Sequence, residues 1–522
     1  MKKKLLTKFC AVAMAVAMVG TMVGCGDDDN TPAGNDNTTP GTEQQGGNDQ
    51  QGGDEQQGGD EQGDDQADAQ TYDFGGAVVR VSGGIWGDIN PDNEGNASYI
   101  EKMDLVPQLE AKYNIKIEYV KLEGDEGLST TELILAGFTN GQCYADLFCV
   151  GDDVTIRLRD YLVDISSFKD ELQMGSIYVD PVTWYGKTYG FTYDNMGSVY
   201  VMAYSRKFLE SIGMNVTPTE KFLKGEWSYD DCIEYFTEMK EQLPEGTYPI
   251  AVHSNHWVSM APAANGTLSV DSNGGIHLAD DDYVEAINFY QQLLDLGLAS
   301  PMVDVVWADD GSLEDITEPY GMDDMCTATQ AKDHVLTMVE AWQMSSLEGK
   351  LEGEWGIVPW PWGSSVTCTP GEDGYKTLSE NYHTAQSIWT NMVAAQKEYR
   401  GADAQQIPDN VLFQIARDWC DLCDANGAAA RYRMWEAEKN GEEYENLGYT
   451  PGTQGNFSTM EDAALYDWLH SRVVVDWAHA VASFVRTNMN GYMTIGGGQD
   501  ARSSGESYAS QGREALKEAF GN

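Results

Sequence analysis

The chain has 522 residues, too many for one compact hydrophobic core, so two or more lobes are expected. Its 41% hydrophobic and 11% aromatic residues are sufficient to fill such cores. A net charge of −52 argues against nucleic acid and other polyanions as partners, because an acidic surface repels them. The charge is consistent with a soluble extracellular protein and a neutral or cationic ligand.

Residues 1–24 have the pattern of a bacterial secretory signal peptide. Four lysines open the segment and an apolar run from Phe9 to Val19 follows, which is too short for a stable membrane span. The next residues, Thr21-Met22-Val23-Gly24-Cys25, resemble a lipobox, in which small residues precede a cysteine that is lipidated and becomes the new N-terminus. Met22 stands where Leu is most often found. The alternative is an ordinary signal peptide with an incidental cysteine.

Residues 25–70 are predicted to be the lipidated Cys25 and a disordered tether. Residues 26–70 are mostly Asp, Glu, Gln, Gly and Asn, with no Lys, Arg or aromatic residue, so they cannot bury a core. Such a chain has a reach of roughly 35–40 Å, enough to lift a folded domain off a membrane. The expected location is therefore the extracellular face of the cell membrane, with the protein held there by its lipid.

Strands and helices alternate along the first part of the remaining chain. Residues 77–83 alternate apolar and polar and predict a strand. The patterns that follow predict, in order, a helix at Lys102–Tyr113, the strand IKIEYVKL, the helical stretch STTELILAGFTNG, the strand YADLFCV and a helix near Val154–Tyr161. This alternation predicts an α/β fold with mainly parallel strands.

Two further strands are expected between Tyr189 and Ser205, interrupted by Tyr193, Asp194 and Asn195. After Gly213 the pattern becomes helix-rich. A helix capped by Ser228 is predicted first. The later expected elements are a helix at Asp281–Leu296, strands in VEAWQM and GEWGIVPWP, and helices at Asp409–Cys423, Met460–Arg486 and Arg513–Phe520.

The cysteines do not predict a disulfide framework. Seven remain beyond Cys25, an odd number spread over a large domain. Cys420 and Cys423 share one face of a predicted helix, and a lone C-x-x-C without a nearby His is weak support for zinc or redox work. We expect both to be small core residues, and leave open whether Cys143 and Cys149 pair.

The order of these elements resembles the extracellular solute-binding lipoproteins of ATP-driven sugar importers, of the family 1 type. The resemblance spans nearly all of residues 77–522. The segments that carry it are VPQLEAKYNIKIEYV, NGQCYADLFCV (without the usual proline), YGKTYGFTYDNMGSVYVMAYSRKFLESIG, GEWSYDDCIEYFTEMK, DDYVEAINFYQQLLDLGLASP and EGEWGIVPWPWG. It implies a two-lobed periplasmic-binding-protein fold of type II. Lobe 1 would comprise 71–193 and 358–425, and lobe 2 would comprise 194–357 and 426–522.

The resemblance also implies a function and a site. A monomer would capture an oligosaccharide between the lobes and deliver it to the permease of an ABC transporter, without a cofactor or catalysis. Tyr193, Asp194 and Asn195 would lie at the hinge facing the ligand, and Trp342 would stack on a sugar ring. Asp and Asn can pair with sugar hydroxyls, and aromatic faces meet the C–H groups of a pyranose.

Further candidates come from position in the chain. Trp86 and Asp88 follow the first strand after two glycines, and Asp152 and Asp153 follow the strand YADLFCV. Strand carboxyl ends in open α/β sheets face the ligand crevice. The remaining candidate aromatic residues are Trp257, Trp307, Trp362 and Trp389. The alternatives are a loop anchor for Trp86 and Asp88, core or interface packing for the other tryptophans, and helix capping for Asp152 and Asp153.

A calcium loop is a weaker hypothesis. Asn90, Asp92, Glu94 and Glu101 stand at positions one, three, five and twelve of a segment with Gly95 at position six. The segment departs from the usual pattern at its first, fifth and eighth positions, and no helix is evident before it. A solvated acidic loop is the alternative.

Two other classes of function remain as alternatives. A glycoside hydrolase needs two carboxylates at a set separation, which a sequence rich in Asp and Glu does not reveal. A surface lipoprotein that binds glycans without transport is the other. The identity of the sugar, its linkage and its length are left open, as is the transporter.

Replacement of Cys25 tests the anchor. The Cys25→Ser variant should move from the membrane fraction to the soluble fraction, because a hydroxyl cannot carry the thioether-linked lipid. Cell fractionation with immunoblotting measures this, and Cys10→Ser, within the predicted signal, is the control. A Cys25→Ser protein still held in the membrane fraction would contradict the lipoprotein prediction.

Overall fold

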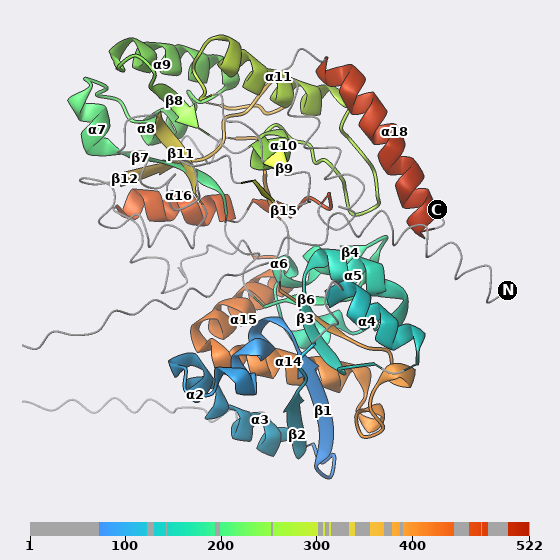
Figure 1. Ribbon diagram of the computed structural model, residues 1–522. Coiled ribbons are helices and arrows are strands. Elements are labelled where there is room, and N and C mark those ends of the chain that lie inside the picture. The colour runs from blue at the N-terminus through green and yellow to red at the C-terminus, as the bar shows by residue number, and fades with distance from the viewer. Residues whose placement is uncertain are drawn as a thin grey trace, which may run out of the picture.

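The computed structural model describes two lobes, each built around its own β-sheet (Figure 1). The described residues are 72–122, 130–141, 143–193, 199–251, 254–300, 306–307, 313–314, 334–339, 355–369, 378–386, 390–442, 459–470, 472–478 and 500–520. Among them, no helix is both long and apolar enough to cross a membrane. The predicted signal, Cys25 and the tether lie outside the described residues.

Lobe 1 contains a five-stranded sheet in the order β2-β1-β3-β14-β6. Its strands are β1 (Ala77–Ser82), β2 (Ile115–Tyr119), β3 (Leu147–Val150), β6 (Gly190–Thr192) and β14 (Asn391–Ala394). β1 is parallel to β2 and β3, whereas β14 is antiparallel to β3 and β6. All four residues of β3 are buried, which explains its continuous apolar sequence.

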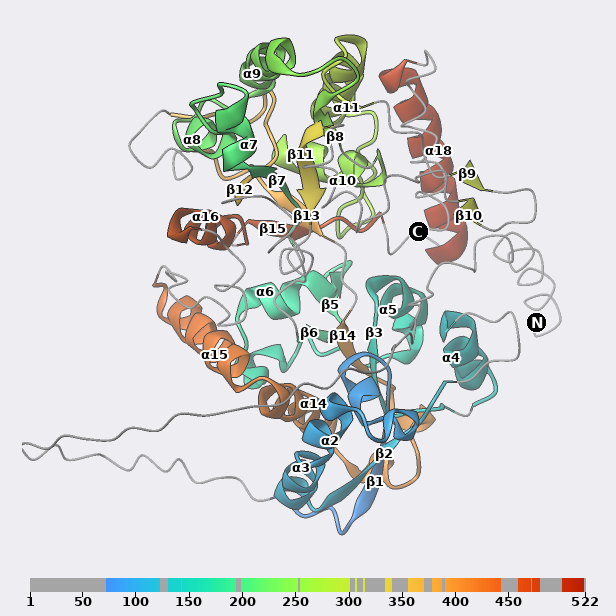
Figure 2. The same cartoon turned by 60° about the vertical axis from the view of Figure 1, so that its left-hand side comes forward.

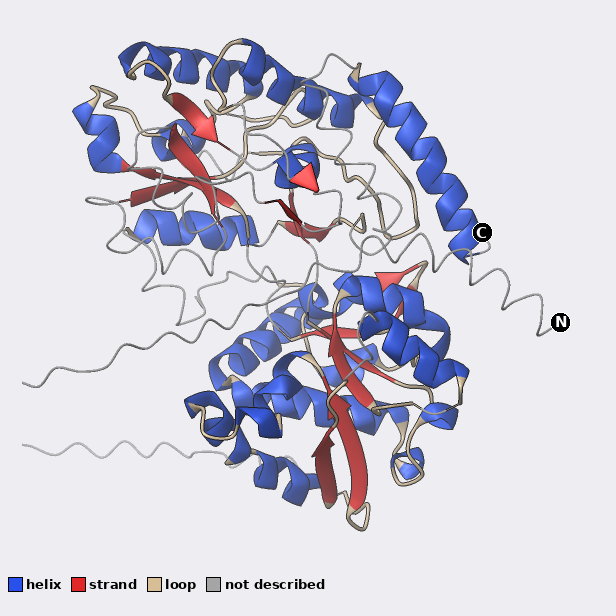
Figure 3. Ribbon diagram, in the orientation of Figure 1, coloured by secondary structure: helices blue, strands red, loops and turns tan. Residues whose placement is uncertain are grey.

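Helices cover both faces of this sheet (Figure 3). They are α2 (Ala97–Met103), α3 (Val106–Tyr113), α4 (Thr130–Thr139), α5 (Asp152–Leu158), α6 (Ser176–Val179), α14 (Asp409–Cys423) and α15 (Ala425–Asn440). Short 3₁₀ turns occupy Gly84–Ile89, Pro91–Asn93, Arg159–Tyr161, Lys169–Leu172, Asp180–Val182, Lys397–Tyr399 and Ala404–Gln406. A hairpin of β4 (Thr183–Trp184) and β5 (Lys187–Thr188) completes the lobe.

Lobe 2 contains a four-stranded sheet in the order β12-β7-β11-β8. Its strands are β7 (Val201–Ser205), β8 (Tyr248–Ala251), β11 (His334–Val339) and β12 (Trp355–Val358). Small ladders join β13 (Thr384–Gln386) to β15 (Val473–Val475) and β9 (Val306–Trp307) to β10 (Leu313–Glu314). The helices are α7 (Arg206–Ser211), α8 (Pro218–Leu223), α9 (Tyr229–Gln242), α10 (Ser254–Ala264), α11 (Asp281–Asp295), α16 (Met460–His470) and α18 (Ala501–Phe520).

The expected two-lobed α/β fold is confirmed, with more antiparallel pairing than the alternation alone indicated. In the four-stranded sheet of lobe 2, β8 is parallel to β11, whereas β7 is antiparallel to both of its neighbours. The Ser228 cap predicted from sequence is present, because its hydroxyl accepts from the backbone N–H of Asp231. The single helix expected over Met460–Arg486 is instead α16 followed by β15, whose three valines favour a strand.

Contacts in the structure place two segments in a different lobe from the one expected. Within 358–425, Trp360 packs on Trp257 of lobe 2, and β13 lies beside α10 in that lobe. In the segment expected in lobe 2, α15 packs on lobe 1, where the Glu438 carboxylate accepts from Ser176. The chain therefore passes between the lobes from β6 to β7, from β13 to β14 and from α15 to α16.

A buried carboxylate joins α16 to the sheet of lobe 2. Asp462 is 0% exposed, and its oxygens accept from Arg206 Nη2 at 2.6 Å and from the backbone N–H of Ile357 at 3.1 Å. The Thr459 hydroxyl also donates to Asp462, at 2.6 Å. One side chain thus holds α16, α7 and β12 together.

Asp462→Ala should therefore be strongly destabilising. Removing one partner leaves the Arg206 guanidinium and a buried N–H uncompensated, a loss of about 3 kcal/mol or more in the free energy of unfolding. Urea denaturation measures the loss. Glu461→Ala, at the exposed neighbouring position on α16, is the control and should change stability little. Equal, small effects of both variants would contradict the assigned role.

Candidate functional site

The two sheets present strand ends toward each other, and these ends form the candidate site (Figures 1 and 2). In lobe 1, β6 runs toward lobe 2 and β14 arrives from it, so Thr192 and its partner Asn391 mark the edge that faces lobe 2. Asn391 also pairs with Val150, which places the carboxyl end of β3 at the same edge. In lobe 2 the start of β7 and the ends of β11 and β12 share the corresponding edge.

Two glycines bring the chain after β1 close against β3. Gly83 has φ 78° and Gly84 has φ 41°, in the left-handed region that disfavours side chains. A Cβ on Gly83 would lie 2.4 Å from the Cys149 carbonyl oxygen, and one on Gly84 would lie 2.1 Å from the Cys149 Sγ. Larger residues at these positions would displace the turn Gly84–Ile89 from the edge of the sheet.

Trp86 does not line an exposed surface. Its side chain is 0% exposed and stacks on Trp419 of α14, with ring centroids 5.2 Å apart and an interplanar angle of 6°. The turn after β1 folds back over the sheet, which directs the ring into the core of lobe 1. The expectation that Trp86 is an open platform for a sugar is therefore replaced by a packing role.

Asp88 lies in the same turn and is half-buried. Burial raises the pKa of this carboxyl, the nearby Lys102 opposes the rise, and Glu101 adds to it. A carboxylate in this position at the edge of the sheet remains a candidate ligand contact.

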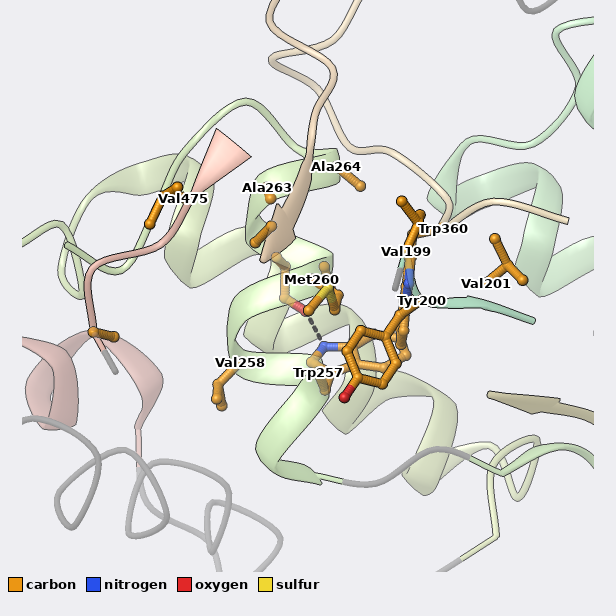
Figure 4. Close-up of a cluster of buried hydrophobic side chains, with 14 of the residues drawn as sticks. Val199, Tyr200, Val201, Trp257, Val258, Met260, Ala263, Ala264, Trp360 and Val475 are labelled. Carbon is orange, nitrogen blue, oxygen red and sulfur yellow. Dashed lines mark hydrogen bonds between the residues drawn. The ribbon is translucent and has the colours of Figure 1, made fainter. Parts of the chain in front are cut away.

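Two other tryptophans on the list of candidates pack inside lobe 2. Trp257 is 0% exposed, and its Nε1 donates to the Ala286 carbonyl at 3.1 Å. Figure 4 shows it among buried side chains beside Tyr200 and Trp360. Trp362 is 3% exposed and meets Phe222 edge-on. Core packing, the alternative reading from sequence, accounts for both.

The structure describes some of the remaining candidate residues and not others. Tyr193 is half-buried against the core of lobe 1 and directly precedes the connection to lobe 2. Asp152 and Asp153 occupy the first turn of α5, immediately after β3, where their backbone lies at the edge that faces lobe 2. Trp307 lies on the short strand β9. Asp194, Asn195, Trp342 and Trp389 lie outside the described residues.

A polar group at the edge of lobe 1 was missed from the sequence. Asn391 is 1% exposed, its Nδ2 donates to the Thr155 hydroxyl at 3.3 Å, and its Oδ1 has no hydrogen-bond partner among the residues that the structure describes. The hydroxyls of Thr192 and Thr390 lie 3.3 Å apart beside it. The available signal was the polar residue at the facing end of each apolar strand, in GFT and NMVA.

Both lobes also touch through the β4–β5 hairpin. Its tip, Tyr185-Gly186, has φ values of 49° and 73°, and the Tyr185 backbone N–H donates to the Ser272 carbonyl of lobe 2 at 2.9 Å. Trp184 contacts Trp477 of lobe 2, with ring centroids 5.1 Å apart. The lobes therefore meet directly in addition to their chain connections.

The calcium-loop hypothesis is not supported by the geometry. The Asn90 side chain accepts from the backbone N–H of Asp92, and the Asp92 carboxylate pairs with Lys121 at 2.5 Å. Glu94 ends a 3₁₀ turn and Glu101 pairs with Lys102 at 3.3 Å. Across the described parts of the chain, no three His, Cys, Asp or Glu residues are grouped to hold a metal.

Among the described residues no cysteine forms a disulfide, and Cys143 and Cys149 are both buried. Burial raises the pKa of Cys143 to about 12, and it also raises the pKa of Cys420. Both are buried, and Cys423 is partly buried against the core of lobe 1. The core role expected for Cys420 and Cys423 therefore fits their surroundings, and Cys143 and Cys149 are not paired with each other.

Comparison with known proteins gives one family and a common fold. A family model for bacterial extracellular solute-binding proteins matches residues 95–361. The sugar-binding protein MalE from Xanthomonas citri has a similar structure, with a TM-score of 0.56 and 13% identity over 84% of this chain and 98% of that chain. The galacto-N-biose-/lacto-N-biose I-binding protein of a Bifidobacterium longum ABC transporter has a TM-score of 0.51 and 14% identity over 85% and 98%. No curated protein matches the chain by sequence.

Trp86→Ala tests the packing role. Removing a fully buried indole that stacks on Trp419 should lower the free energy of unfolding by about 3–5 kcal/mol. Urea denaturation measures this, with Tyr432→Ala as the control, because Tyr432 is 44% exposed. A Trp86→Ala protein as stable as the control variant would show that the ring is not part of the core.

Proposed function

This chain belongs to the bacterial extracellular solute-binding proteins, and on that premise we propose that it captures an oligosaccharide between its two lobes for delivery to an ABC transporter permease. The observation that carries the proposal is the arrangement of the two sheets. Their strand ends face each other across three chain connections, as required for two lobes that close around a ligand.

The chemistry of the facing edges suits a sugar. Thr192, Thr390 and Asn391 offer hydroxyl and carboxamide groups, which both donate and accept hydrogen bonds as sugar hydroxyls do. Asp152 and Asp153 begin a helix at the same edge. On the side of lobe 2, Tyr200 directly precedes β7 and is 8% exposed.

The ligand contacts that we propose are therefore mostly polar in lobe 1 and aromatic in lobe 2. Asp88, Asp152, Asp153, Tyr193, Asp194 and Asn195 would bind hydroxyls. Trp342 follows β11, whose carboxyl end shares the facing edge of lobe 2, and would stack on a sugar ring. Trp307 and Trp389 are further aromatic candidates.

The cellular setting belongs to the same proposal. A lipid on Cys25 would hold the protein on the extracellular face of the cell membrane, and the acidic tether of 26–70 would let the monomeric binding domain reach the permease. The family and the similar folds consist of binding proteins, which favours capture over catalysis. A glycoside hydrolase and a glycan-binding lipoprotein without a transporter are the alternatives that the next experiment addresses.

Binding without turnover is the test. The mature chain with Cys25→Ser should bind one or more members of an oligosaccharide panel in calorimetry and return the sugar intact after hours of incubation. Trp342→Ala should weaken binding on the order of 10-fold, because a stacking surface is lost. Trp468→Ala is the matched control, since its ring packs on Tyr382 inside lobe 2. Cleaved sugar in the incubation would favour the hydrolase instead, and no binding across the panel would contradict the proposal.

A further inference from the structure

One arginine of lobe 1 binds the backbone where the chain passes from lobe 1 to lobe 2. Arg431 lies on α15 and is 3% exposed. Its Nη1 donates to the Tyr193 backbone carbonyl at 3.1 Å, and its Nη2 donates to Asp421 Oδ1 at 2.8 Å. The guanidinium also lies over the Tyr178 ring, 5.9 Å from the centroid. Four elements of lobe 1 therefore meet at this side chain.

The position of Tyr193 makes this contact unusual. Tyr193 follows β6 and directly precedes the connection that reaches lobe 2 at Val199. Arg431, which binds its carbonyl, lies on α15, the last described helix of lobe 1 before the chain returns to lobe 2 at α16. One guanidinium thus ties the lobe 1 end of the first connection to α15, the helix that precedes the third connection.

The second connection, from β13 to β14, ends beside the start of the first. Thr390, directly before β14, has its hydroxyl 3.3 Å from that of Thr192, the residue before Tyr193. The β14–β6 ladder pairs Asn391 with Thr192. The first two connections therefore start from one small region of lobe 1, and Arg431 ties that region to α15.

We propose that Arg431 is a positioning residue that sets the equilibrium between the open and closed arrangements of the lobes. It acts by fixing the Tyr193 backbone at the lobe 1 end of the first connection, next to the point about which the lobes rotate when they close. Because a ligand that binds the closed form must shift this equilibrium, the clamp controls affinity without touching the ligand. Only the expected effect on ligand affinity rests on the proposed function. The expected effect on the arrangement of the lobes does not.

The chemistry of the clamp requires arginine. A planar guanidinium donates in two fixed directions at once, here to a carbonyl and a carboxylate, whereas a lysine ammonium on a flexible stem does not hold both in one geometry. Arg431→Lys keeps the charge and loses that fork. Arg431→Lys therefore separates positioning from charge neutralisation.

Arg417 provides a matched control within the same lobe. It lies on α14, its Nη1 donates to the Leu172 carbonyl at 3.0 Å, and its Nη2 donates to Asp418 at 2.9 Å. Both arginines thus bridge a backbone carbonyl and an aspartate, and both approach Asp421, since Arg417 Nε lies 3.7 Å from its Oδ2. The two side chains differ in which backbone carbonyl they bind. Leu172, however, lies within lobe 1 rather than at a connection. Arg417→Lys should cost similar stability and leave the lobe equilibrium unchanged.

The experiment compares wild type, Arg431→Lys and Arg417→Lys in the mature chain with Cys25→Ser. Thermal unfolding measures stability, small-angle X-ray scattering of the ligand-free protein measures the lobe arrangement, and calorimetry measures affinity for the best oligosaccharide of the panel. We expect both variants to lower the melting temperature. Only Arg431→Lys should alter the ligand-free distance distribution and weaken binding by about 5-fold or more.

Ligand-free scattering and affinity of Arg431→Lys equal to those of Arg417→Lys would overturn the proposal and leave Arg431 a purely structural residue. If Arg431→Lys does not fold, Asp421→Asn serves instead, because it keeps the arginine and weakens its anchor. If wild type binds no oligosaccharide, the proposed function fails, and the ligand-free scattering alone decides the role of Arg431.

Discussion

The parallel pairing of β1 with β2 and β3 is the constraint on which the rest of the structure depends. Parallel neighbours must be joined by crossovers, so helices lie between these strands in the sequence and cover the faces of the sheet. The same pairing brings the carboxyl ends of β1 and β3 to one edge. Gly83, Gly84 and the start of α5 therefore gather where lobe 1 faces lobe 2, and the candidate ligand contacts follow from that geometry.

Much of the fold could be predicted from local patterns. The helix expected at Asp409–Cys423 has the bounds of α14, since its apolar spacing matches one buried helix face. The strands after residue 77 and at YADLFCV are also present. By contrast, the contacts of α15 place it in lobe 1 rather than in the expected lobe 2, because a helix whose apolar residues are mostly alanine and are spread around it does not reveal its partner. Its side of the boundary is decided by Arg431 and Glu438, whose partners lie far away in the sequence.

The candidate site could be predicted less well, for a related reason. A tryptophan after a strand can point toward the other lobe or back into its own, and only the tertiary partner decides. Trp86 packs on Trp419, more than 300 positions further along the chain, so its burial left no local trace. Asn391 was not predicted, because one polar residue at the start of an apolar strand resembles an ordinary strand end.

Basic residues are scarce in this chain, 32 against 84 acidic ones, and several of them stand at joints between distant segments. Arg80 pairs with the fully buried Asp146 at 2.7 Å, and Arg206 pairs with Asp462. The described partners of Asp476 are backbone N–H groups: burial raises the pKa of this carboxyl, and the N–H groups of Ser269, Val270 and Ala478 oppose that rise. Each of these buried carboxylates thus joins segments that are far apart in the sequence.

The place of β14 in the sheet has a consequence for how the protein is made. This strand lies between β3 and β6 but follows them by about two hundred residues, after most of lobe 2. During synthesis from the N-terminus, β3 therefore lacks its neighbour on that side until residue 394 is available. Pairing over such a long separation is slow, and an unpaired apolar edge invites premature association. The same delay keeps the nascent chain from completing a compact lobe 1 before most of lobe 2 has been synthesised.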